Sequence, residues 1–248
     1  HGGLVEGNEL YDTHARATGN PTTKLNIDTG DGWVVRANYI HDFQKGGGDN
    51  VAYGAFMKSG GKDGVFERNL VMCERTLKGG VTIGLSFGGG GTASEFCAPA
   101  FDPGKACDPE HTGGTMRNNI VVGCSDVGIY LNRSQSTKIL HNTLIATSGV
   151  DFRYASSTGE ARGNVLAGKV RARDGAAFTN INDLADVSSA DFASWYVDPA
   201  AADLRKKGDL GALIDLASQA SVTDDFCGRP RTGKHDLGAV EHSLGDCD

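Results

Sequence analysis

The sequence is poor in several features that define common protein classes. No stretch approaches the ~20 consecutive apolar residues of a membrane-spanning helix, so no membrane partner is expected. No two cysteines form a CxxC pair, which disfavours a zinc ribbon or a thioredoxin-type site. Lysine and arginine number 24 against 31 acidic residues, and the net charge of −7 disfavours a nucleic-acid partner. Six prolines against 36 glycines, with 7% aromatic residues, favour many turns over a helical bundle.

Cysteine usage indicates the compartment. Cys97 and Cys107 bracket a short polar loop, and a bridge between Cys227 and Cys247 would fasten the C-terminal tail. Disulfides persist in oxidising compartments, so we expect a protein that is secreted, periplasmic or on the cell surface. The alternative is that the cysteines are free buried thiols. The six are Cys73, Cys97, Cys107, Cys124, Cys227 and Cys247.

One phrase, an asparagine followed by alternating apolar residues, recurs six times. Successive asparagines are separated by 30, 31, 50, 23 and 22 residues. A period of this length with period-2 hydrophobicity inside it predicts a solenoid of strands. Equivalent asparagines then fall at one corner of successive coils, where their side chains can form an amide ladder. The asparagines are Asn8, Asn38, Asn69, Asn119, Asn142 and Asn164.

A second series of short strands lies between the asparagine phrases, at 23–30, 55–60, 81–87, 128–134, 150–155 and 169–174. Two or three such strands per turn, joined by Gly, Asn and Asp bends, make one coil of an all-β, parallel β-helix. We predict coils over residues 1–175, interrupted by a long inserted loop at about 88–113. The run of four glycines at 88–91 lacks the Lys-Ser/Thr of a phosphate loop and is read as a wide turn.

Residues 176–248 break the period, and we expect them to form an irregular capping tail that packs on the coils. A helical turn or two is expected within residues 202–220. Residue 1 begins no signal peptide and enters a repeat directly. Upstream coils, another domain or another subunit are therefore expected to cover the first coil.

Alternation along the second series sorts its side chains by face. The inward positions are predicted to be Ile27, Met57, Ile83, Leu131, Phe152 and Ala172. The outward positions are then Asp28, Lys58, Gly84 or Ser86, Tyr130, Asn132, Asp151, Arg153, Arg171 and Arg173. Lys58 and Arg153 would be three rungs apart, roughly 14 Å, which suits an extended polymer. Cations gathered on one face of an acidic chain favour an anionic ligand, although they could simply solubilise an exposed sheet.

Two stretches, FMKSGGKDGVFERN and DDFCGRPRTGKHDLGAVE, together with the periodicity, carry a family resemblance. The chain resembles bacterial right-handed parallel β-helix proteins of the pectate-lyase-like superfamily. Met57-Lys58-Ser59 looks like the chondroitinase B and alginate lyase branch, in which a lysine of a similar strand abstracts the proton. The resemblance implies that role for Lys58. In that branch the next coil brings an arginine beside the lysine, whereas this chain has Thr82-Ile83-Gly84-Leu85-Ser86.

A lyase of uronate chains needs a base, a group that neutralises the carboxylate, and an acid for the leaving oxygen. Lys58 is the candidate base, Arg153 or Arg171 would neutralise the carboxylate, and Tyr130 would protonate the leaving group. His111, near the end of the insertion, is an alternative base or a structural residue. The remaining candidates for contact with an acidic polysaccharide are Ser86, Asn132, Asp151 and Arg173.

The sequence is also compatible with two other functions. A glycoside hydrolase needs two carboxylates, and only Asp151 and Glu110 are candidates on this face. No cofactor is predicted; calcium could bind Asp28 or Asp151, but no clustered ligand spacing supports a site. The alternative to an enzyme is a non-catalytic β-helix that binds glycans or assembles into filaments.

Overall fold

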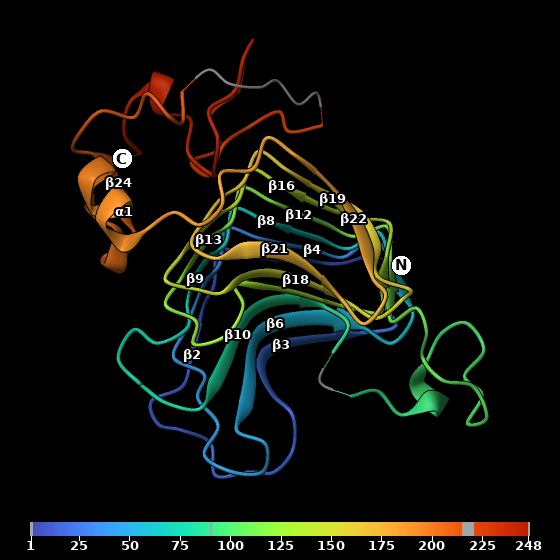
Figure 1. Cartoon of the computed structure of the whole chain (residues 1–248). Coiled ribbons are helices and arrows are strands. Elements are labelled where there is room, and N and C mark those ends of the chain that lie inside the picture. Colours follow the sequence, from blue (N-terminus) through green and yellow to red (C-terminus); the bar gives the residue numbers. More distant parts are fainter. Residues whose placement is uncertain (1, 90, 215–220, 248) are drawn as a thin grey trace.

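The computed structural model describes residues 2–89, 91–214 and 221–247 (Figure 1). The chain is all-β, with short strands assembled into several parallel sheets, as expected for a β-solenoid. The first sheet contains β1 (Leu4–Glu6), β4 (Val34–Arg36), β8 (Val65–Glu67), β12 (Thr115–Arg117), β16 (Thr137–Leu140), β19 (Thr158–Arg162) and β22 (Ala177–Ile181).

After each strand of the first sheet except β22, the chain continues into two further sheets. The second sheet contains β2 (Glu9–Tyr11), β5 (Tyr39–His41), β9 (Leu70–Met72), β13 (Ile120–Val122), β17 (Thr143–Ile145) and β20 (Val165–Leu166). The third sheet contains β3 (Thr22–Asp28), β6 (Val51–Lys58), β10 (Val81–Phe87), β14 (Ile129–Asn132), β18 (Gly149–Arg153) and β21 (Lys169–Arg173). A small corner sheet holds β7 (Gly61–Lys62), β11 (His111–Thr112) and β15 (Ser134–Gln135).

The asparagine ladder is present at the corner between the first and second sheets. The Oδ1 atom of Asn119 accepts from the backbone N–H and the Nδ2 atom of Asn69, at 3.0 and 2.9 Å. The same pattern links the other asparagines and ends at Asp183, whose Oδ1 accepts twice from Asn164 at 2.8 Å. Residues before the asparagines, such as Ala37 and Asn118, adopt a left-handed backbone with φ near 50°. The ladder satisfies the polar groups that this sharp turn buries.

The register of the third sheet corrects one inward assignment. Met57 pairs with Phe87, and both lie in the core, whereas Ile83 pairs with Tyr53 and lies in a cluster on the outer side of the sheet. Gly54 and Ala55 are consecutive residues that both face inward, because a side chain on Gly54 would meet Val71 and Phe43 of the core. Two adjacent inward residues shift the alternation by one position, as in a β-bulge.

The inserted loop leaves the solenoid after β10 and returns at β11 (Figure 1). It contains the short helix η1 (Ser94–Phe96) and the Cys97–Cys107 disulfide. A backbone hydrogen bond from Ala98 to Ser59 attaches it to the corner of the third sheet. Gly90, within the glycine run, lies outside the described residues.

The C-terminal tail packs on the side of the solenoid, against the outer face of the second sheet (Figure 1). It contains α1 (Ser189–Trp195), η2 (Pro199–Ala201), η3 (His242–Leu244) and the antiparallel pair β23 (Tyr196–Asp198) and β24 (Asp203–Lys206). Its Phe192 and Leu237 share one apolar cluster with Met72, Val122 and Ile145 of the sheet.

The helical turn predicted within residues 202–220 does not occur in the described part of that segment, residues 202–214. Residues 203–206 form β24, and residues 215–220 lie outside the described residues. Among the residues that the structure describes, the one α-helix, α1, is seven residues long and begins at Ser189. A capping box between Ser188 and Asp191 starts that helix. The strands of the last coil, β21 and β22, keep exposed side chains.

Three disulfides join all six cysteines. The Cys97–Cys107 and Cys227–Cys247 bridges match the sequence interpretation, and Cys73–Cys124 links two successive coils after β9 and β13. They indicate an oxidising compartment. No helix in the described part of the chain is long and apolar enough to cross a membrane.

Candidate functional site

The outer face of the third sheet brings together eight of the nine predicted site residues. Register places them in two columns, with neighbouring rungs at the strand spacing of about 4.8 Å. One column contains Asp28, Lys58, Asn132, Arg153 and Arg173, with Gly88 on the rung between Lys58 and Asn132. The other contains Asn26, Phe56, Ser86, Tyr130, Asp151 and Arg171.

Two arginines of β21 share one carboxylate of β18. Arg171 Nε lies 2.6 Å from Asp151 Oδ1, and Arg173 Nη1 lies 2.8 Å from Asp151 Oδ2. The arginine side chains are 40% and 47% exposed, whereas that of Asp151 is 2% exposed. The guanidinium groups therefore cover the carboxylate and keep their remaining N–H donors toward solvent. Asp126 adjoins this group, and its pKa is raised by burial and by the charge of Asp151.

Tyr130 lies at the centre of a second polar group. Its hydroxyl accepts from Arg153 Nη1 at 3.3 Å and from Asn132 Nδ2 at 3.2 Å. Burial raises the pKa of Tyr130, so the phenol holds its proton at neutral pH. Arg153 Nε also forms an ion pair with Asp174 Oδ2 at 2.7 Å.

These ion pairs change the expected electrostatics of the face. The arginines lie together, as predicted, but Asp151 and Asp174 pair with them, and Asp126 adds another carboxylate nearby. With both of its carboxylates ionised, the group of Asp126, Asp151, Arg171 and Arg173 has no net charge. The face is an array of polar donors and acceptors rather than a strip of one sign.

Lys58 lies beneath the start of the insertion. Only 7% of the residue is exposed, and its Nζ atom donates to the carbonyl oxygen of Gly91 at 2.7 Å. The ammonium group lies 4.8 Å from the centroid of the Phe56 ring and 3.9 Å from Asp28 Oδ1. Ser86 is also buried, with its hydroxyl donating to Gly88 O at 2.5 Å. The insertion leaves the sheet at this point, so it covers two residues that alternation alone predicts to be open.

A hollow of about 430 Å³ opens beside Lys58 and was not predicted from the sequence. Phe96 and Phe101 of the insertion line it and are 59% and 54% exposed. The sequence signal that could have indicated this hollow is the presence of two phenylalanines in an otherwise polar loop. The lining residues are Asp28, Thr29, Lys58, Ser59, Gly91, Thr92, Ala93, Phe96 and Phe101.

Two hydroxyl groups that line this hollow are hydrogen-bonded to carboxylates. Ser59 Oγ donates to Asp28 Oδ1 at 2.6 Å, and Thr92 Oγ1 donates to Glu110 Oε2 at 2.9 Å. Glu110 also accepts from the Ser59 backbone N–H, and burial raises the pKa of its carboxyl group. Glu110 therefore holds the insertion against the corner of the solenoid.

His111 does not overhang this face. Its imidazole is fully buried, stacks on Phe87 at 4.2 Å between ring centroids, and has no hydrogen-bond partner on either nitrogen. Burial lowers the pKa of His111 to about 3, so the ring is neutral. Because β11 places residue 111 in the corner sheet rather than in the loop, its side chain enters the core.

The alternative hydrolase site finds little geometric support. Glu110 is engaged by Ser59 and Thr92, and Asp151 by two arginines, so neither carboxylate faces the other across an open site. Within residues 2–89, 91–214 and 221–247, no three His, Cys, Asp or Glu side chains cluster in a way that could hold a metal ion.

Comparison with known proteins gives no family: no family model, no curated protein and no solved structure matches the chain.

Proposed function

We propose that this is a secreted carbohydrate-active β-solenoid protein that binds a uronate-containing polysaccharide along the outer face of the third sheet. The observation that carries the proposal is the sharing of one buried carboxylate, Asp151, by two half-exposed arginines, Arg171 and Arg173. Each guanidinium has five N–H donors in a planar fork. The donors not used by Asp151 suit sugar hydroxyl groups and a sugar carboxylate.

The length of the face favours a polymer over a single sugar. From Lys58 to Arg173 the column crosses four rungs, about 19 Å at strand spacing. Tyr130, Asn132 and Arg153 occupy the middle of this path, and the hollow beside Phe96 and Phe101 lies at one end. An extended chain can contact all three regions at once.

β-Elimination is the second proposed function of the same face, and the contact between Tyr130 and Arg153 favours it. A protonated phenol held by a guanidinium suits an acid that protonates the leaving oxygen, while Arg153 neutralises the uronate carboxylate. Lys58 lies two rungs from Tyr130, about 10 Å, and donates to Gly91. Its role as base depends on release of that hydrogen bond and on a sugar bound between the two residues.

We infer a right-handed parallel β-helix of the pectate-lyase-like type, because parallel crossover connections are right-handed in about 98% of cases and two sequence stretches resemble that superfamily. Three disulfides support secretion, to the periplasm, the cell surface or the medium.

Binding is tested by affinity electrophoresis in gels that contain polygalacturonate, alginate or chondroitin sulfate, with neutral dextran as the comparison. The double variant Arg171→Ala/Arg173→Ala is expected to lose retardation in acidic gels. Arg205→Ala is the matched control, since Arg205 is an exposed arginine paired with Asp203 in the tail. Equal retardation of wild type and double variant would refute the proposal.

Catalysis is tested separately with the same polymers. Elimination creates an unsaturated sugar end that absorbs ultraviolet light, and Tyr130→Phe is expected to lower the rate of its appearance. Retardation without any absorbance change would assign the protein to the non-catalytic alternative, a glycan-binding or self-assembling β-solenoid. Light scattering at rising protein concentration then distinguishes simple binding from assembly.

A further inference from the structure

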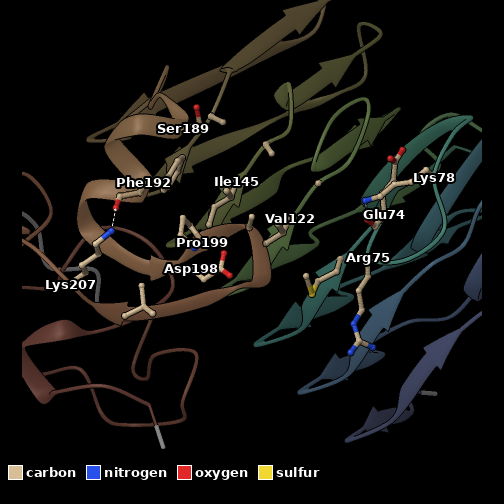
Figure 2. Close-up of a pocket in the computed structure, with 17 residues that line it drawn as sticks. Glu74, Arg75, Lys78, Val122, Ile145, Ser189, Phe192, Asp198, Pro199 and Lys207 are labelled. Carbon is tan, nitrogen blue, oxygen red and sulfur yellow. Dashed lines mark hydrogen bonds between the residues drawn. The ribbon is translucent and has the colours of Figure 1, made fainter.

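A second hollow lies on a different wall of the solenoid, between the outer face of the second sheet and the C-terminal tail (Figure 2). Its volume is about 540 Å³, within the range of small-molecule sites. Met72, Val122 and Ile145 come from three strands of the sheet, β9, β13 and β17, and form its floor. Phe192 of α1 closes the opposite side, as Figure 2 shows.

The hollow continues into a neighbouring one. This neighbouring hollow has a volume of about 530 Å³ and is lined by Leu70 and Tyr39 as well. Both hollows are lined by Met72, Arg75 and Asp198, so Arg75 lies at their junction. The apolar floor offers side chains without hydrogen-bonding groups, which suits an alkyl or aryl body and not a hydroxyl-rich sugar.

The cations around this hollow differ from those of the third sheet. Within the described part of the chain, no carboxylate lies within 4.0 Å of Arg75, whose guanidinium carbon lies 5.5 Å from the centroid of the Tyr39 ring. Lys207 Nζ donates to Ala193 O at 3.2 Å, and Lys78 Nζ donates to Glu74 O, both backbone carbonyls.

The balance of charge at the rim is positive. Three cations, Arg75, Lys78 and Lys207, stand against two carboxylates, Glu74 and Asp198. Asp198 is already used, because its Oδ1 accepts from the Ala201 backbone N–H and caps η2. The exposed Arg75 is thus the group best placed to receive an anion at the mouth of an apolar cleft.

We propose that this hollow binds an amphipathic monocarboxylate, with its apolar body on Met72, Val122 and Ile145 and its carboxylate at Arg75. The site is separate from the polysaccharide face and does not depend on the function proposed for that face. Each buried methylene strengthens binding about fourfold until the floor is covered. The ion pair with Arg75 adds about tenfold for a carboxylate over an alcohol of the same length.

The test uses the full chain and isothermal titration calorimetry with octanoate, decanoate and dodecanoate, each below its micelle concentration, and with dodecanol. We expect affinity to rise along the carboxylate series and dodecanoate to bind about tenfold tighter than dodecanol. Absence of binding by all four probes overturns the proposal, as does equal affinity for dodecanoate and dodecanol.

Two variants with exposed positions keep the test independent of folding. Arg75→Gln is expected to remove the preference for dodecanoate and to leave dodecanol unchanged. Val197→Asp places a charge at the apolar lip, where Val197 is 47% exposed, and is expected to weaken both probes. Arg205→Gln in the tail is the control. Unchanged binding in both Arg75→Gln and Val197→Asp means that the probes bind elsewhere and overturns the assignment.

Discussion

Lys58 and Gly91 are joined by a 2.7 Å hydrogen bond that closes one end of the outer face of the third sheet. The bond connects the column of site residues to the insertion, so Lys58, the predicted base, also attaches the loop to the sheet. Its charged head is held between a carbonyl oxygen, an aromatic ring and the carboxylate of Asp28. A structural role and a catalytic role for Lys58 therefore predict different phenotypes.

Lys58→Met separates these roles, because methionine keeps the apolar stem over Phe56 and loses the ammonium group. The lost hydrogen bond is expected to cost about 1–2 kcal/mol of the free energy of unfolding, measured by urea denaturation. If Lys58 is the base, β-elimination is abolished while polysaccharide binding persists. Lys62→Met, at an exposed lysine of β7, is the control. Elimination at an undiminished rate in folded Lys58→Met would remove Lys58 from the mechanism.

Asp126 is expected to make the proposed binding of acidic glycans depend on pH. Burial and the charge of Asp151 raise its pKa, so it takes up a proton at a higher pH than an ordinary aspartate. Protonation leaves Arg171 and Arg173 opposite one carboxylate, and the local charge becomes positive. Affinity for polygalacturonate is therefore expected to increase as the pH falls from neutrality, as long as the uronates remain ionised.

Asp126→Asn mimics the protonated form and is the sharper measurement of this effect. At neutral pH the variant is expected to bind polygalacturonate about two- to fivefold more tightly than wild type, the scale of one partly screened charge interaction. Its affinity profile against pH is expected to be flatter. Weaker binding at neutral pH, or a profile identical to that of wild type, contradicts the assigned role of Asp126.

The asparagine ladder is expected to carry much of the stability of the solenoid. Asn119→Ala removes an acceptor used twice by Asn69 and two donors, which bond Asn142 Oδ1 and Phe66 O. The backbone N–H of Asn69 is left unpaired, whereas Asn142 Oδ1 keeps the backbone N–H of residue 119 as a donor. The expected loss is about 2–4 kcal/mol by urea denaturation. Asn8→Ala is the control, because the ladder begins at this exposed position. A loss at Asn119 no larger than at Asn8 would show that the ladder contributes little.

The ladder was predictable from the sequence, and the face was predictable only in part. Each of the six asparagines follows a residue in the repeat turn, and the turn requires a polar side chain at that position. Because the requirement recurs in every coil, it produces a repeating pattern in the sequence. Strand alternation likewise placed Tyr130, Asp151, Arg153 and Arg171 on one face. Alternation did not predict the face of Ile83. Gly54 and Ala55 are adjacent and both face inward, so residues before them, including Tyr53, the partner of Ile83, lie on the opposite face from the one that alternation predicts.

The burial of Lys58 and His111 could not be predicted, because it results from contacts between segments that are far apart in the sequence. Alternation indicates which side of a sheet Lys58 takes, but not that Gly91 covers it. Similarly, His111 follows a polar loop in the sequence, and only its pairing with Gly61 and Ser134 brings the ring into the core against Phe87. The charges showed the same limit, since Asp174 pairs with Arg153 from the next coil.

Asp183 ends the ladder with a carboxylate where the earlier rungs have an amide, and this makes stability depend on pH. Burial raises the pKa of Asp183 to about 6, against 3.8 for an ordinary aspartate, and its Oδ2 atom is buried without a partner. Between these two pH values the folded chain holds a proton that the unfolded chain has lost. The contribution of Asp183 to the free energy of unfolding therefore falls as the pH rises through that window and stays low above it.

Asp183→Asn removes the ionisable group and places an amide at this rung, as in the earlier rungs of the ladder. The new Nδ2 atom can donate to a strand carbonyl, as that of Asn164 does to Ile139 O, and Oδ1 still accepts from Asn164. Because Asp183 is partly exposed, we expect a gain of about 1–2 kcal/mol near neutral pH, below the full value of the shift, and almost none near pH 4. Urea denaturation of wild type and variant at both pH values measures the difference. A gain of equal size at the two pH values would trace the stabilisation to the added hydrogen bond alone and not to the buried charge.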